Sequence, residues 1–261
     1  MNIDYFHVDT FTGRLFSGNP AGVCLLPEDQ PNEQLQRIAA EVNLPVTAFL
    51  TTVGSTFHIR WFTPDDELSL CGHGTLAAAS VIFHQLNYSD HIVKIESPTA
   101  GLLAVKNKND LIELNFPSKK ITNISPQTIL AEGLGTAIRE AYLGADRVLV
   151  VVEDESIVQM LDPNFELLKQ LGYRGIVVTG PSQTADFVSR TFYPGKTIKE
   201  DPVTGSSHCL LVPYWAKRLK KRNLYAKQLS KRGGELFCDF QEERTLISGE
   251  AKLFLKGRIA I

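Results

Sequence analysis

The sequence contains the pattern Phe-x-x-Arg-x-Phe-x-Pro twice, and this repeat limits the possible folds more than any other feature. The first copy spans residues 57–64 and the second residues 187–194, an offset of 187 − 57 = 130 positions in a chain of 261 residues. Each copy predicts an alternating strand that ends at a proline, and a glycine-led helix start follows each one. The same strand, turn and helix in the same order indicate two copies of one structural unit.

The predicted elements distribute between two mixed lobes. The first half predicts helices at 32–41 and 73–86 and strands at 4–9, 22–26, 48–52, 57–62, 92–96, 101–106 and 111–116. The second half predicts helices at 126–134 and 206–220 and strands at 147–152, 175–179, 187–193, 236–239, 245–248 and 251–259. We expect an α+β fold of two pseudo-symmetric lobes, each a curved, mostly antiparallel sheet around a buried helix. The expected lobes are 1–120 and 121–261, with a last strand that can return to the N-terminal lobe.

The charge distribution gives no general signal for a nucleic-acid partner, because the net charge is −2 at pH 7. Only the segment 217–232 is strongly basic, with eight Lys or Arg residues and no acid. We interpret this segment as a solvated helix end followed by a hairpin, since base-reading aromatic residues and a groove-binding motif are missing.

The four cysteines lie far apart without a Cys-x-x-Cys pair, so reduced thiols are expected and no zinc site is indicated. The first twenty residues lack a basic region followed by an apolar stretch, and no apolar run approaches the roughly 18 residues that span a bilayer. We therefore expect a cytoplasmic protein that does not contact a membrane.

The helix starts at 72–75 and 205–208 are candidate anion sites. First-turn N–H groups have no partner within their own helix, and the helix dipole favours a negative charge there. If the lobes face each other, both starts point into one cleft and can bind the carboxylate of a small acid and stabilise enolate-like charge. The expected binding residues are Gly72, Gly74, Thr75, Gly205 and Ser207. Alternatively, the glycines only let each helix enter the core, and Thr75 and Ser206 are caps.

Three side chains near these starts can take part in proton transfer. His73 lies in a first helical turn, where the positive end of the dipole lowers the pKa of an imidazole and favours its neutral form. Cys71 precedes the same start, so the same field favours its thiolate. Pro202 and Val203 occupy the facing motif, which disfavours a pair of thiols. Asp201 precedes Pro202 and is either a turn residue or a third candidate.

Six ordered motifs resemble the PhzF-like isomerase family of phenazine biosynthesis. They are Asn19–Gly22, Asn43–Phe49, Phe62–Leu68, Cys71–Ala79, Asp201–His208 and Gln228–Gly234. The resemblance runs from Phe6 to Gly257 and implies the diaminopimelate-epimerase-like fold, an active site between the lobes, no cofactor or metal, and a homodimer. It also implies that His73, Asp201, Gly205 and Ser206 occupy active-site positions and that Asn19 lines the cleft.

The stretch 43–47 departs from this family. Members typically read Asn-Leu-Ser-Glu-Thr, in which the Glu is the acid/base, whereas this chain reads Asn-Leu-Pro-Val-Thr and has Val46 at that position. Loss of a positioned acid/base typically costs about 10²–10⁴ in rate. Three interpretations follow. The protein is an isomerase or epimerase acting on a small cyclic or acyclic carboxylate, with the base relocated to Asp201, His73 or Cys71. Otherwise it is a catalytically silent relative that binds a small acid, or an interaction protein that uses the segment 217–232.

Overall fold

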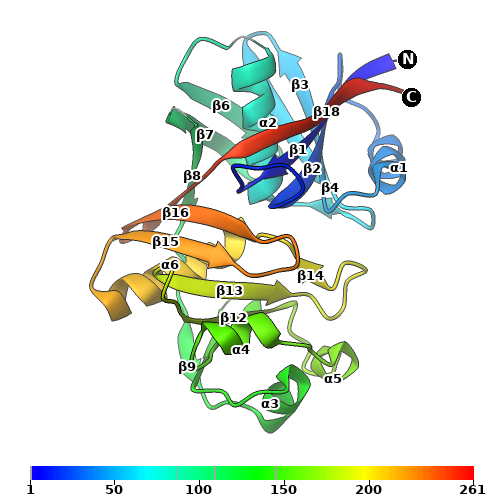
Figure 1. Cartoon of the computed structure of the whole chain (residues 1–261). Helices are drawn as coiled ribbons and strands as arrows, with labels where there is room; N and C mark the ends of the chain where they lie inside the picture. Colours follow the sequence, from blue (N-terminus) through cyan, green and yellow to red (C-terminus); the bar gives the residue numbers. More distant parts are fainter. Residues whose placement is uncertain (1, 87, 109, 145) are drawn as a thin grey trace. The chain divides into compact units, whose positions relative to one another are not determined.

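The computed structural model describes residues 2–86, 88–108, 110–144 and 146–261, which form two compact units (Figure 1). Unit 1 comprises Met1–Asn115 and Ser248–Ile261, and unit 2 comprises Phe116–Ile247. Both ends of the chain belong to unit 1, because strand β18 (Ala251–Ala260) pairs antiparallel with β1 (Asn2–Thr10). No helix within the described residues has the length and apolar character that crossing a membrane requires.

Unit 1 contains helices α1 (Asn32–Val42) and α2 (Gly72–Gln85) and a mostly antiparallel set of strands. Besides β1 and β18, these strands are β2 (Asn19–Leu25), β3 (Thr47–Val53), β4 (Thr56–Phe62), β5 (Glu67–Leu68), β6 (Ile92–Ser97), β7 (Gly101–Lys108) and β8 (Leu111–Pro117), which ends in unit 2. The parallel pairs are β2 with β3 and β4 with β6.

Helix α2 is the buried helix of unit 1. All of its residues from Gly72 to Phe83 are buried, and it contacts β1, β2, β3, β7 and β18. This follows from its sequence, which is apolar on nearly every face and so must be enclosed on every side. Helix α1 is amphipathic and buries only Leu35 and Ala39, against a cluster that includes Phe49 and Phe62.

Unit 2 contains four helices among its described residues and a second mostly antiparallel set of strands. The helices are α3 (Thr128–Leu134), α4 (Glu155–Met160), α5 (Phe165–Lys169) and α6 (Gly205–Leu219). The strands are β9 (Thr122–Ile124), β10 (Glu140–Leu143), β11 (Arg147–Val151), β12 (Gly175–Pro181), β13 (Phe187–Phe192), β14 (Glu200–Asp201), β15 (Asn223–Gln228), β16 (Gly234–Gln241) and β17 (Arg244–Gly249), whose last two residues belong to unit 1.

The two units pair their strands in the same order, which confirms the duplication predicted from the sequence. Unit 1 follows β1–β2–β3–β4–β6–β7 and unit 2 follows β10–β11–β12–β13–β15–β16. In each series the second and fourth pairings are parallel and the others antiparallel. The repeated motif therefore forms equivalent strands, β4 in unit 1 and β13 in unit 2.

The repeated arginine makes the same ion pair and the same ring contact in both strands. The Nε of Arg60 donates to Oε1 of Glu67 at 2.8 Å, and the Nε of Arg190 donates to Oε1 of Glu200 at 2.7 Å. In each case Nη2 donates to the second carboxylate oxygen at 2.9 Å. The guanidinium carbons lie 5.2 Å and 5.0 Å from the ring centroids of the phenylalanines two positions further on, Phe62 and Phe192. The motif thus encodes a bidentate ion pair stacked on a ring.

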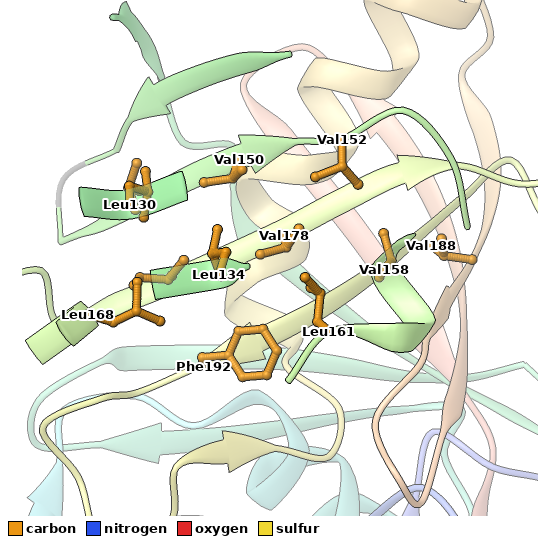
Figure 2. Packing of buried hydrophobic residues seen from close by; sticks show 12 residues of the cluster. Leu130, Leu134, Val150, Val152, Val158, Leu161, Leu168, Val178, Val188 and Phe192 are labelled. Atoms are coloured by element: carbon orange, nitrogen blue, oxygen red, sulfur yellow. The ribbon is translucent and has the colours of Figure 1, made fainter. Parts of the chain in front are cut away.

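The short helices α3, α4 and α5 cover one face of the unit 2 sheet (Figure 2). The buried cluster joins strand side chains such as Val150 and Phe192 to helix side chains such as Leu130 and Leu168. Helices α4 and α5 were not predicted from the sequence, because five or six residues are too few to show a periodic pattern. Both have an N-cap whose side chain accepts a first-turn backbone hydrogen bond, Asp154 in α4 and Asn164 in α5.

Helix α6 packs on the opposite face of this sheet. The Nε1 of Trp215 donates to the Oγ1 of Thr179 at 3.0 Å, and the indole stacks on Phe187 with ring centroids 5.6 Å apart. Thr179 and Val178 are adjacent on β12 and therefore point to opposite faces. The sheet of unit 2 is thus buried on both sides and fixes the position at which α6 begins.

The basic segment 217–232 forms the end of α6 and the hairpin of β15 and β16, as predicted. Lys220 ends α6 in the left-handed conformation, with φ at 54°. Arg218 Nη1 lies 2.7 Å from a carboxylate oxygen of Glu140, and Lys221 Nζ lies 2.7 Å from one of Asp186. Acids elsewhere in unit 2 therefore neutralise part of this segment, which weakens the interpretation as an interaction surface.

Candidate active site

The start of helix α2 is not capped by a side chain. Its cap residue is Cys71, which makes no side-chain capping hydrogen bond. The carbonyl of Cys71 instead accepts two hydrogen bonds from Thr75, one from its hydroxyl at 2.6 Å and one from its backbone N–H at 3.0 Å. Thr75 is therefore not the cap that the alternative interpretation required. The N–H groups of Gly72, His73 and Gly74 have no acceptor within the helix, because no carbonyl of α2 precedes them.

His73 is a second buried polar side chain of this start, besides Thr75. It is 8% exposed, and its Nδ1 lies 3.3 Å from the Sγ of Cys71. Burial lowers the pKa of His73 to about 3, because a charged imidazolium is poorly solvated there. Its Nε2 is buried and has no hydrogen-bond partner among the described residues. At neutral pH the ring is therefore neutral, and Nε2 can exchange a proton or a hydrogen bond with a ligand.

Val46, where the resemblance places the family glutamate, packs against the same start. A Cβ atom added to Gly74 would lie 2.8 Å from Cδ1 of Trp61, 3.2 Å from Cγ1 of Val46 and 3.3 Å from Sγ of Cys71. The Val46 and Cys71 atoms are therefore at most 3.2 + 3.3 = 6.5 Å apart. Val46 is fully buried, so a charged group at this position would be poorly solvated.

Asn19 is the last predicted site residue of unit 1. It begins β2, is fully buried, and its carbonyl accepts a hydrogen bond from the hydroxyl of Thr10 at 2.8 Å. Helix α2 contacts β2, so the strand that carries Asn19 supports the helix that carries His73.

The start of α6 in unit 2 is held by a network of side chains. Its cap residue Thr204 makes no side-chain capping bond, and the hydroxyl of Thr204 donates to Oδ2 of Asp201 at 2.7 Å. Gln228 of β15 donates from Nε2 to the carbonyl of Asp201 at 2.7 Å and accepts the backbone N–H of Thr204 at 2.9 Å. Asp201 is therefore fixed beside the first residue of the helix, Gly205.

Ser206 and Ser207 contact a buried charge that sequence reasoning missed. Arg147 is 5% exposed, and its Nη1 donates to Oγ of Ser206 at 3.2 Å and to Oγ of Ser207 at 3.0 Å. Its Nε and Nη2 each donate to Asp146 at 2.9 Å. Burial opposes the charge of Arg147, yet the hydrogen bonds to Asp146 raise its pKa. The signal that the sequence offered for Arg147 was a positive charge directly before the apolar run 148–152.

The structure brings the predicted residues together in two groups. In unit 1, Val46 and Cys71 lie against Gly74, which follows His73 in the helix start. In unit 2, Asp201 lies beside the start that includes Ser206. That both groups act on one ligand stays a prediction.

Comparison with known proteins finds one family whose members match this chain over nearly its whole length. The family model described as phenazine biosynthesis-like protein matches residues 8–257. An uncharacterized isomerase of Pseudomonas aeruginosa is 42% identical over 261 residues, which cover 100% of both chains. The crystal structure of a PhzF-family phenazine biosynthesis protein from Enterococcus faecalis has a TM-score of 0.97 at 43% identity, with 100% of both chains covered.

A more distant structure shows the same fold. It is a hydroxyproline epimerase from Agrobacterium vitis, with a TM-score of 0.67 at 10% identity over 100% of this chain and 93% of that one. The chain therefore belongs to the phenazine biosynthesis-like, or PhzF-like, protein family and has the diaminopimelate-epimerase-like fold.

Proposed function

We propose that this protein is a cofactor-independent isomerase or epimerase that transfers a proton on a small cyclic or acyclic carboxylate, with His73 as the proton carrier. The observation that carries the proposal is the neutral, buried ring of His73, whose Nδ1 contacts Cys71 while Nε2 has no partner among the described residues. The isomerase name of the Pseudomonas aeruginosa relative supports the reaction class.

The chemistry begins with Nε2 of His73, which removes a proton from the carbon beside the ligand's carboxyl group. The carbon then shares its negative charge with the carboxyl oxygens, and the N–H groups at a helix start stabilise that charge. The enolate-like charge also stabilises the new imidazolium, which burial alone disfavours. Nε2 then returns the proton to a different carbon, or to the other face of the same carbon after the planar intermediate has turned over in the site. Cys71 holds the ring through Nδ1 and so keeps Nε2 directed at the ligand.

The side chain of Val46 favours a second candidate function. It is fully buried beside the helix start and carries no proton, so the family's own acid/base is absent. A protein with this site but without a working base would bind a small acid and leave it unchanged.

Proton exchange in D₂O separates the two candidates. A dihydro-hydroxyanthranilate-type acid and a set of simpler carboxylates are incubated with wild type and with His73→Gln, and deuterium incorporation is followed by NMR. The proposal expects exchange with wild type and at least a 100-fold loss in the variant. Saturable binding without exchange would support the silent relative, and equal exchange by both proteins would exclude His73 as the carrier.

A further inference from the structure

The two helix starts occupy equivalent positions in the duplicated units but have different surroundings. In α2 the third residue is Gly74, which has room for no side chain because of Trp61 and Val46. In α6 the third residue is Ser207, which contacts the guanidinium of Arg147. A buried charge is costly unless it is paired and hydrogen-bonded. The buried charge of Arg147 beneath the start of α6 therefore requires a reason specific to that start.

Hydrogen-bond roles show what Arg147 does to the two serines. A guanidinium only donates, so Oγ of Ser206 and Oγ of Ser207 must both accept from it. Ser207 is fully buried and also accepts from the hydroxyl of Thr191 at 3.3 Å. Ser206 is partly exposed, and Arg147 is its hydrogen-bond partner among the described residues. The hydroxyl proton of Ser206 is therefore left to donate to a group outside the protein.

The charges around this start favour an anion as that group. Hydrogen bonds from Arg147 lower the pKa of Asp146, and the charges of Lys119 and Arg174 add to that effect. Burial raises the pKa of the Cys209 thiol in α6 to about 11, and the positive charges of Lys119, Arg147 and Arg244 oppose this rise. Two carboxylates lie near this start, Asp146, which is paired with Arg147, and Asp201, which accepts from Thr204.

We propose that Arg147 is a positioning residue, which holds the hydroxyl of Ser206 as a hydrogen-bond donor toward the carboxylate of a ligand at the start of α6. The identity of the ligand as a carboxylate rests on the proposed function. The hydroxyl of Ser206 and the backbone N–H groups of Gly205 and Ser206 all donate, so these groups match a carboxylate and offer no acceptor to the NH₂ group of the corresponding amide. Arg147 therefore determines specificity without contacting the ligand.

The test compares acids with their amides. Binding of benzoate, cyclohexanecarboxylate and pyrrole-2-carboxylate, and of the three matching primary amides, is measured by calorimetry for wild type, Arg147→Lys and Ser206→Ala. Arg218→Lys is the matched control, because it also replaces an ion-paired arginine of unit 2, at the other end of α6. We expect at least one acid to bind wild type and the control with a Kd at least tenfold below that of its amide. The ratio of the amide Kd to the acid Kd, called the acid-to-amide ratio below, should fall about tenfold in both test variants.

The outcomes distinguish this inference from the proposed function. Retention of the acid-to-amide ratio in Ser206→Ala, or in a folded Arg147→Lys, would overturn the inference, as would the absence of saturable binding for every acid below about 10 mM. If Arg147→Lys does not fold, as judged by circular dichroism, Ser206→Ala alone decides the question. Loss of the ratio together with no proton exchange by wild type would leave the inference standing and reject the enzymatic proposal.

Discussion

The Sγ atom of Cys71 lies 3.3 Å from Nδ1 of His73, at the start of a helix that is buried from Gly72 to Phe83. The contact engages one ring nitrogen and leaves the other, Nε2, for a ligand. Val46, where the resemblance places the family glutamate, lies against the same start. These contacts generate predictions about rate, about pH dependence and about the effect of restoring a carboxylate.

Removal of the thiol should slow proton exchange without abolishing it. Cys71→Ala frees the ring of His73 to rotate, so exchange should fall about tenfold, against about 10²–10⁴ for His73→Gln. Deuterium incorporation by NMR measures both. Cys24→Ala is the matched control, because it also removes a buried thiol of unit 1 but lies in the cluster beneath α1. An equal loss in Cys24→Ala would mean that Cys71 acts only through stability.

Restoration of a carboxylate should raise activity. In Val46→Glu the new carboxyl group would replace a fully buried valine, so its pKa should rise above its usual value of about 4.3, which suits proton transfer near neutral pH. The variant should exchange protons faster than wild type. Val46→Gln is the control, since an amide of the same shape cannot carry the proton. Equal rates in both variants would contradict the prediction.

The same substitution should change the dependence of stability on pH. Because the folded-state pKa of the carboxyl group introduced by Val46→Glu would exceed the unfolded value, the cost in unfolding free energy should be smallest below about pH 4.3 and should grow as the pH rises toward the folded-state pKa. Urea unfolding of the variant and of wild type between pH 4 and 8 measures this difference. A difference that does not vary with pH would show that the carboxyl group reaches water.

Acid should destabilise the protein through its two buried imidazoles. Burial lowers the pKa of His73 to about 3 and that of His208 to about 4, from 6.5 in the unfolded chain. The unfolded chain therefore binds more protons below pH 6.5, so this contribution is complete above that pH and is lost as the pH falls through 6.5 toward 3–4. Urea unfolding of His73→Gln should show a shallower decline than wild type. If the unfolding free energies of the two proteins declined identically with falling pH, the lowered pKa of His73 would be contradicted.

The duplicated architecture was predictable because its signal is local. The repeated strand appears as β4 and β13, and the predicted helices 73–86 and 206–220 differ from α2 and α6 by one residue at each end. Runs of apolar residues and flanking glycines specify these elements without long-range information. The basic segment 217–232 was also interpreted correctly, since a helix end and a hairpin place such charges in water.

The arginine pairs encoded by the repeat should stabilise both units alike. Arg60→Lys and Arg190→Lys each remove a bidentate ion pair and a ring contact, so each should lower the unfolding free energy by about 1–2 kcal/mol. Urea unfolding of the single and double variants measures the effect, and the double variant should show the sum because the pairs lie in separate units. A lower unfolding free energy in only one of the two single variants would show that the ion pair stabilises the two units unequally.

Arg147 could not be predicted as part of the site, because its role depends on long-range contacts. It is 59 residues from Ser206, and only the pairing of β11 with β12 and the burial of α6 bring the two together. The contact between Cys71 and His73 spans two residues, but their burial depends on the strands around α2. The sequence thus indicated which residues to consider at the two starts, and tertiary packing determined which of them are charged, neutral or paired.

The pairing of β1 with β18 also determines when each unit can be completed during synthesis of the chain. Residues 116–247 form unit 2 as one continuous segment, so this unit can fold independently of β18. Strand β1 precedes this segment in the chain, whereas its partner β18, residues 251–260, follows it. The unit that holds His73 is therefore completed only after β18 has been made, so a chain truncated before Ala251 would contain an intact second unit and an incomplete first one.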